Sequence, residues 1–201
     1  MNETLKLFDD GSVPARKVAA RLSQLMIADG ADFITRPVER ATLDFEGLAG
    51  DRHRGLYRPA DSRVPWYPRG TPIRNARQVT LVAPDELALI ARRLEVPAVE
   101  PAWLGANLVL EGVADLTALP PGTRLHFPGG ACLAVEGENA PCRHAGAAVA
   151  RHHPGRTGLD LAFVTAARGR RGLVAWVERP GELVAGSPVE LRVPAQKLWG
   201  R

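Results

Sequence analysis

Residues 119–136 read Leu-Pro-Pro-Gly-Thr-Arg-Leu-His-Phe-Pro-Gly-Gly-Ala-Cys-Leu-Ala-Val-Glu. Two short apolar runs in this stretch, 123–127 and 131–136, are separated by Pro128-Gly129-Gly130, and Pro120-Pro121-Gly122 precedes the first run. Gly and Pro are the strongest punctuators of local structure, so neither run can extend into a long helix. The stretch therefore predicts two neighbouring β-strands joined by a tight turn.

Short runs of the same kind recur along most of the chain, which contains 20 Gly and 17 Pro among 201 residues. Helices are predicted at 84–94, where acids occupy the first turn and arginines the last, and at 143–151. Many short strands with few helices are typical of a β-barrel or a sandwich. Further strands are expected at Thr42 to Phe45, 78–82, 107–110, 160–165, 172–178 and 187–193.

The first thirty residues follow a different pattern. Ser12 and Pro14 are suited to begin a helix and Gly30 to end it, and apolar residues between them recur at helical spacing. The pattern predicts an amphipathic helix that packs on the main body, with a partner-binding helix as the alternative. The apolar residues of this predicted helix are Val18, Leu22, Leu25 and Met26.

Length and composition favour a single domain, because single cores stop growing only above about 250 residues. The expected organisation is an N-terminal helical extension over 1–33, a β-barrel domain over 34–195 and a C-terminal tail over 196–201. No apolar stretch approaches the ~20 residues of a membrane-spanning helix. The start of the chain also lacks the basic and apolar segments of a secretory signal, so a cytoplasmic protein is expected.

Positive charge is concentrated in one part of the chain. The whole sequence carries 26 Lys and Arg against 22 Asp and Glu, and the window 52–77 holds seven arginines against the single acid Asp61. The turn Gly50–Gly55 has a composition suited to holding an anion, although the arginine-rich window as a whole also fits a solvated basic loop. Residues 58–75 show no sustained period and are predicted to form a long surface loop. Because no nucleic-acid recognition module is present, the expected partner is an anionic cofactor rather than nucleic acid.

Cys142 is the residue whose surroundings best suit chemistry. It precedes the predicted helix 143–151 and is followed by Arg143 and His144. A helix N-terminus and neighbouring cations both favour the thiolate, which is the nucleophilic and metal-binding form of cysteine. Cys132 lies within an apolar strand and is expected to be inert. On the residues alone, a reactive and an inert Cys142 both remain open.

A zinc site is a weaker interpretation of the same region. Cys142, His144, His152 and His153 fall within twelve residues. A tetrahedral zinc site usually shows two close ligand pairs, and only Cys142 and His144 are close here. His144 and His152 would lie about 12 Å apart along a helix, which one metal cannot span. A helix end is therefore favoured for the histidine pair.

Six short segments follow one another in a distinctive order and spacing: 47–53, 77–81, 104–108 with Glu111-Gly112, 119–125, Asn139–Cys142 and 171–186. Together they resemble the MOSC domain, named for the C-terminal domain of molybdenum cofactor sulfurases, in a stand-alone bacterial-type form. The resemblance covers roughly residues 35 to 193. Two positions depart from the family pattern, since Ala106 replaces a usual acid and Ser187 a common Gly-Asp.

The resemblance implies a mainly β fold, a small closed or nearly closed barrel with a few short helices. It also implies binding of the molybdenum cofactor (molybdopterin), with Cys142 as metal ligand and functional thiol. The implied cofactor-binding residues are Arg52, His53, Arg77, Asn107, Asn139 and Arg143.

Four functions follow from this combination of features. The first is an oxidoreductase that reduces N-hydroxylated compounds with electrons from a separate reductase. The second is a sulfur carrier for metal-sulfur cofactor assembly, in which Cys142 receives sulfur from a separate donor as a persulfide. The third is a non-catalytic carrier of the molybdenum cofactor. The fourth is a basic structural or RNA-associated barrel in which Cys142 has no role.

Overall fold

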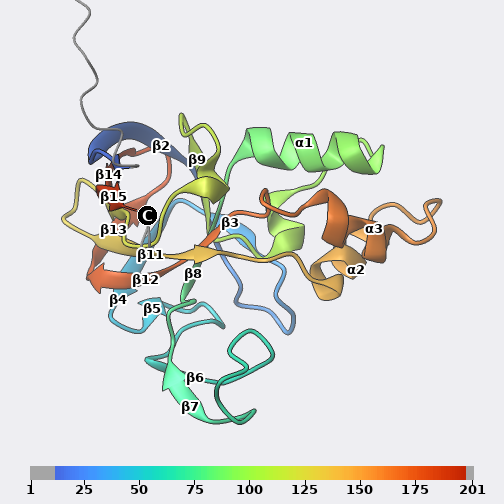
Figure 1. The fold of residues 1–201 in the computed structure, drawn as a ribbon, viewed down its shortest axis with the longest axis horizontal. Coiled ribbons are helices and arrows are strands. Elements are labelled where there is room, and N and C mark those ends of the chain that lie inside the picture. Colours follow the sequence, from blue (N-terminus) through green and yellow to red (C-terminus); the bar gives the residue numbers. More distant parts are fainter. Residues whose placement is uncertain (1–11, 198–201) are drawn as a thin grey trace, which may run out of the picture.

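The computed structural model describes residues 12–197, and within that range seven strands close into a ring in the order β14-β10-β11-β12-β8-β9-β2 (Figure 1). The ring closes where β2 pairs with β14, and β8 and β9 are its one parallel pair within these residues. The predicted mainly β barrel is confirmed. Its strands are β2 (Arg16–Ile27), β8 (Val79–Val82), β9 (Leu108–Glu111), β10 (Arg124–His126), β11 (Cys132–Glu138), β12 (Leu173–Arg179) and β14 (Pro188–Val193).

The predicted N-terminal helix is wrong, because Arg16–Ile27 is strand β2. A β-bulge between Leu22 and Gln24 shifts the register with β9. The extra residue lets Leu22 and Leu25 both face the core, at 0% and 1% exposure, although they are three positions apart. Apolar residues three positions apart also match the periodicity of an amphipathic helix, which explains the wrong prediction. The parts of the predicted extension and tail at 1–11 and 198–201 lie outside the described residues.

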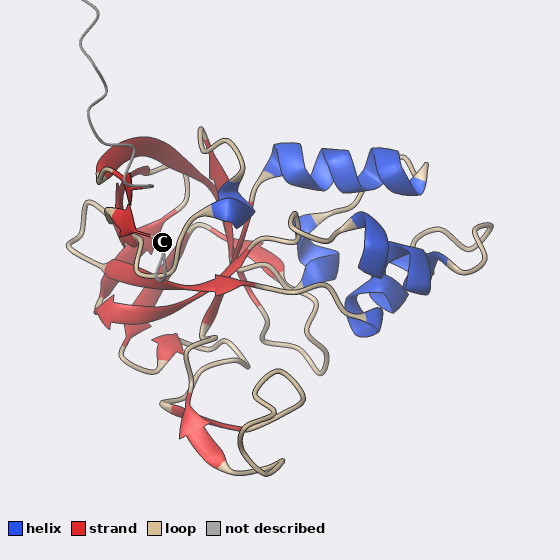
Figure 2. Ribbon diagram, viewed as in Figure 1, coloured by secondary structure: helices blue, strands red, loops and turns tan. Residues whose placement is uncertain are grey.

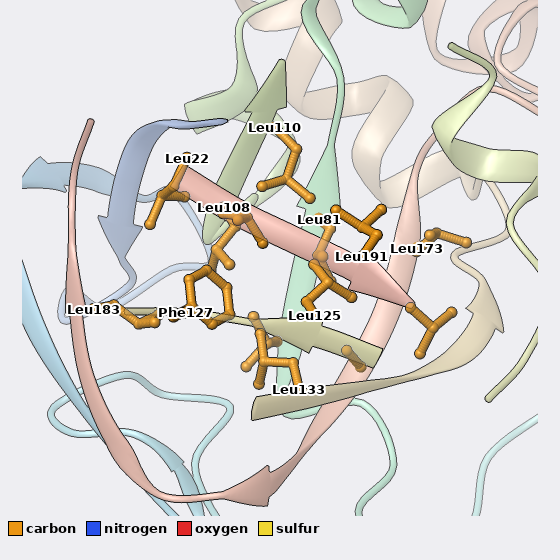
Figure 3. Close-up of a cluster of buried hydrophobic side chains, with 14 of the residues drawn as sticks. Leu22, Leu81, Leu108, Leu110, Leu125, Phe127, Leu133, Leu173, Leu183 and Leu191 are labelled. Carbon is orange, nitrogen blue, oxygen red and sulfur yellow. The ribbon is translucent and has the colours of Figure 1, made fainter. Parts of the chain in front are cut away.

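Leucine side chains fill the interior of the barrel (Figure 3). They come from β2, β8, β9, β10, β11, β12 and β14, so every strand of the ring contributes to one cluster. Burying a leucine contributes about 1.5–3 kcal/mol, and a closed ring leaves no open sheet edge at this core. The labelled members are Leu22, Leu81, Leu108, Leu110, Leu125, Phe127, Leu133, Leu173, Leu183 and Leu191.

Three helices gather on one side of the barrel and share a second core with it (Figure 2). The predictions of α1 (Pro84–Leu94) and α2 (Arg143–Arg151) are confirmed. The strand predicted at 160–165 is wrong, because this segment is α3 (Leu159–Ala166). Its buried residues Leu159, Phe163 and Ala166 follow helical spacing and pack against α1 and α2. Two 3-10 turns, η1 (Pro101–Leu104) and η2 (Leu116–Ala118), complete the helical elements of the described chain.

The remaining strands make small additions to the barrel. Strand β3 (Arg36–Val38) pairs with the end of β2, and β1 (Ser12–Val13) pairs with β15 (Gln196–Lys197). A separate sheet contains β4 (Arg40–Asp44), β5 (Gly47–Leu48) and β13 (Gly181–Val184).

The segment expected to be a long loop contains a hairpin of β6 (Tyr57–Pro59) and β7 (Pro72–Arg74). We call residues 57–74 the arm, which projects from the barrel at the bottom of Figure 1. No helix of residues 12–197 is long and apolar enough to cross a membrane.

Candidate functional site

A cavity of about 410 Å³ opens between the barrel, the arm and the N-terminus of α2. This volume lies within the range of small-molecule and cofactor sites. Of the seven residues predicted to form the site, the cavity brings together Arg52, His53, Arg77, Asn139 and Cys142. Other side chains that line it include Arg54, Tyr57, Arg58, Asp61, Arg63, Thr80, His144 and Arg171.

Cys142 lies at the N-terminus of α2, as predicted. Strand β11 ends at Glu138, and the extended backbone of Cys142 (φ −136°, ψ 160°) makes it the N-cap residue of the helix. Its carbonyl oxygen accepts the N–H of Gly146 at 3.1 Å, and no side chain caps the helix. The half-buried thiol therefore faces the cavity beside the positive end of the helix dipole.

A buried carboxylate orients His53. The side chain of Asp51 is fully buried, and its Oδ1 accepts both the backbone N–H and the Nδ1 of His53 at 2.8 Å. Oδ2 accepts the N–H of Ala28 and the Nδ2 of Asn107, each at 2.8 Å. Burial alone would raise the pKa of Asp51, but these hydrogen bonds outweigh burial and hold the pKa below its ordinary value. An ionised carboxylate can only accept, so Nδ1 of His53 carries a hydrogen.

The guanidinium groups of half-buried Arg77 and buried Arg171 line the same cavity as Cys142. Nη2 of Arg77 donates to Oδ1 of Asn139 at 2.6 Å, and Nη2 of Arg171 donates to the carbonyl of Leu104 at 2.9 Å. Burial lowers the pKa of both arginines to about 10. Both groups therefore remain cationic at neutral pH.

The arm adds further positive charge to the rim. Nη1 of Arg63 lies 2.7 Å from Oδ2 of Asp61, and Nη1 of Arg58 lies 3.5 Å from the same oxygen. Asp61 is the one acid among the residues that line the cavity, against six arginines. Arg54 is itself paired with Asp44 and Glu46, which do not line the cavity. An anion entering the cavity still meets a net positive lining.

Two of the predicted site residues lie elsewhere. Asn107 is fully buried, where its Oδ1 accepts the N–H of Thr80 at 3.0 Å and its Nδ2 holds Asp51. Arg143 points outward and its Nε donates to Asp160 at 2.7 Å. Asn107 thus supports His53 through Asp51, and Arg143 makes no part of the cavity wall.

Arg171 is the cavity residue that the sequence patterns did not single out. It belongs to a segment already matched to the family pattern, but only the fold shows that it lines the same cavity as Cys142. Arg58 and Arg63 were counted in the arginine-rich window, although nothing in the sequence separated them from its exposed members.

The described residues contain no group of three or more His, Cys, Asp or Glu side chains arranged to hold a metal ion. His152 stacks on Trp103 with ring centroids 4.0 Å apart, and His153 meets the same ring edge-on at 5.6 Å.

Comparison with known proteins agrees with this architecture. A family model described as the MOSC domain matches residues 68–190. The chain belongs to the MOSC domain family. The matched segment contains β8, Cys142 and Arg171, so the MOSC domain supplies one wall of the cavity.

Relatives of this MOSC protein extend the match. It is 40% identical over 183 residues to a Bacillus subtilis (strain 168) protein named "Putative metal-sulfur cluster biosynthesis proteins YuaD", with 91% of this chain and 95% of the relative covered. The crystal structure of YuaD superposes with a TM-score of 0.87 over 89% of this chain and 98% of that one. YiiM from Escherichia coli, at 19% identity and a TM-score of 0.57, covers 88% of this chain and 69% of its own, and shares the fold.

Proposed function

We propose that this MOSC protein binds the molybdenum cofactor in the cavity, with Cys142 as the protein ligand to the metal. The observation that carries the proposal is a half-buried thiol in a cavity lined by six arginines and one acid. A soft thiolate suits molybdenum, and guanidinium groups suit a phosphate monoester. The lone thiol also fits a metal whose other ligands come from its own organic cofactor.

The residues present have distinct roles in this proposal. Arg52 and Arg77 would hold the phosphate, and Asn139 fixes the guanidinium of Arg77 through its 2.6 Å hydrogen bond. Nε2 of His53, the ring nitrogen not held by Asp51, is available to take or give a proton. When bound, the cofactor supplies two-electron redox chemistry.

The proposed reaction is reduction of N-hydroxylated compounds, which is the activity that the family resemblance implies. The two cysteines of this chain are too few to ligate an iron–sulfur cluster by themselves, so electrons come from a separate reductase. Turnover distinguishes this proposal from a cofactor carrier, because a carrier binds the cofactor and reduces no substrate.

Arg77→Met is expected to weaken retention of the pterin cofactor by about 10- to 100-fold, because it replaces a half-buried charged donor with an apolar side chain of similar length. Pterin would be quantified by fluorescence after expression in a cofactor-competent host and dialysis. Arg143→Met is the matched control and keeps the wild-type content, since Arg143 is 72% exposed and lies outside the cavity. Equal pterin content in all three proteins would contradict the assignment of Arg77.

A second candidate function is sulfur carriage on Cys142. The specific observation in its favour is that the thiol faces an open cavity, and residues 12–197 contain no group of three or more His, Cys, Asp or Glu side chains arranged for a metal. The name of YuaD, at 40% identity, points in the same direction. In this role Cys142 accepts sulfur from a donor as a persulfide and passes it to a metal or cofactor.

A further inference from the structure

Arg171 has two buried guanidinium nitrogens whose N–H groups are unpaired. The residue is 7% exposed, and only its Nη2 is bonded, to the carbonyl of Leu104. Its Nε and Nη1 have no partner among the residues that the structure describes. Leaving buried charged donors unpaired is costly, so such a group in a native cavity wall indicates a ligand that completes it.

The unpaired guanidinium and the thiol lie in the same cavity. Cys142 is the N-cap of α2, a helix of nine residues whose first turn has no side-chain cap. Helix N-terminus and guanidinium together form a site for an oxyanion next to a nucleophile.

The sulfur donor must carry a sulfur atom that a thiolate can attack and a group that departs readily when that sulfur is transferred. In a thiosulfonate, the sulfonate oxygens form an oxyanion that guanidinium N–H groups can bind. Its leaving group, sulfite or a sulfinate, is a stable anion, so the transfer requires no general acid.

We propose that Cys142 takes sulfur directly from a small thiosulfonate anion of the thiosulfate class, whose sulfonate oxygens bind Nε and Nη1 of Arg171. The inference rests on the second candidate function and names its sulfur donor. The Cys142 thiolate forms a bond to the outer sulfur of thiosulfate as the bond between the two thiosulfate sulfurs breaks. The electron pair of that broken bond leaves with sulfite, and the protein retains a persulfide. The thiol proton passes to water, and no external oxidant or reductant is required.

The test incubates the purified full-length protein, free of reductant, with thiosulfate. Intact mass reports the persulfide as a gain of one sulfur atom, and sulfite release is measured in parallel. Wild type is expected to form one persulfide with one sulfite, and Cys142→Ser neither. Arg171→Met is expected to lower the rate constant with thiosulfate by about 100-fold, as loss of an oxyanion donor does. Its reaction with the neutral disulfide 4,4′-dithiodipyridine should stay within about threefold of wild type, because no sulfonate is bound.

Two controls separate this inference from the function on which it rests. Arg143→Met should react with thiosulfate as wild type does, because Arg143 lies outside the cavity. Wild type that gains sulfur from sodium polysulfide but not from thiosulfate would overturn the inference and leave sulfur carriage standing. No persulfide from either donor would overturn both. A wild-type thiosulfate rate in Arg171→Met would overturn the role of Arg171.

Discussion

Gly172→Ala is expected to lower the free energy of unfolding by about 4 kcal/mol or more, a size reserved for severe strain or overpacking. The backbone at Gly172 has φ +93°, and an added Cβ would lie 2.0 Å from the carbonyl oxygen of Leu81. Gly172 directly precedes Leu173, which pairs with Leu81 where β12 meets β8. Neither strand can therefore move away from the added Cβ without breaking the barrel. Urea denaturation followed by circular dichroism measures the loss.

Gly155→Ala is the matched control for this substitution. An added Cβ at Gly155 would meet no atom within 4 Å, and the backbone there needs no positive φ. Its stability should stay within about 0.5 kcal/mol of wild type. Equal stability of Gly172→Ala and wild type would contradict the close approach of β12 and β8 that places Arg171 in the cavity wall.

Asp51→Asn is expected to cost about 3 kcal/mol, because four donors converge on the carboxylate and an amide can accept from only one side. The effect should depend on pH. Hydrogen bonds hold the pKa of Asp51 below its ordinary value despite burial. The stabilisation by Asp51 is therefore complete above the ordinary aspartate pKa and is lost as pH falls through the folded-state pKa.

Urea midpoints between pH 7 and pH 3 check this dependence. The difference in free energy of unfolding between wild type and Asp51→Asn should shrink as the solution becomes acidic. Asp32→Asn is the control, since Asp32 is exposed and accepts one backbone hydrogen bond, from Ile34. A constant difference between wild type and Asp51→Asn across this range would contradict an ionised, hydrogen-bonded Asp51.

The sequence predicts the barrel well where Gly and Pro separate short apolar runs, as at β10 and β11. It fails where one pattern fits two structures. At β2 a bulge gives leucines three positions apart the same face, so a strand imitates a helix. At α3 the apolar run 159–166 is too short for periodicity to separate strand from helix, and packing against α1 and α2 decides.

The candidate site shows the same division. Cys142 could be predicted because the cue is local: a helix start, a preceding strand and neighbouring cations. Arg171 could not, because its importance depends on which nitrogens the folded chain leaves unpaired. The resemblance places Asn107 among the cofactor-binding residues. In the fold its side chain instead donates a hydrogen bond to Asp51, a residue 56 positions away in the chain.

Molybdenum and pterin content is the measurement that tests the central proposal most directly. Wild type and Cys142→Ser would be expressed in a cofactor-competent host, purified anaerobically and measured by metal analysis and pterin fluorescence. Circular dichroism confirms that both proteins fold. The proposal predicts close to one molybdenum per chain in wild type and loss of the metal from Cys142→Ser. Molybdenum absent from both proteins, or equal in both, would contradict cofactor binding through Cys142.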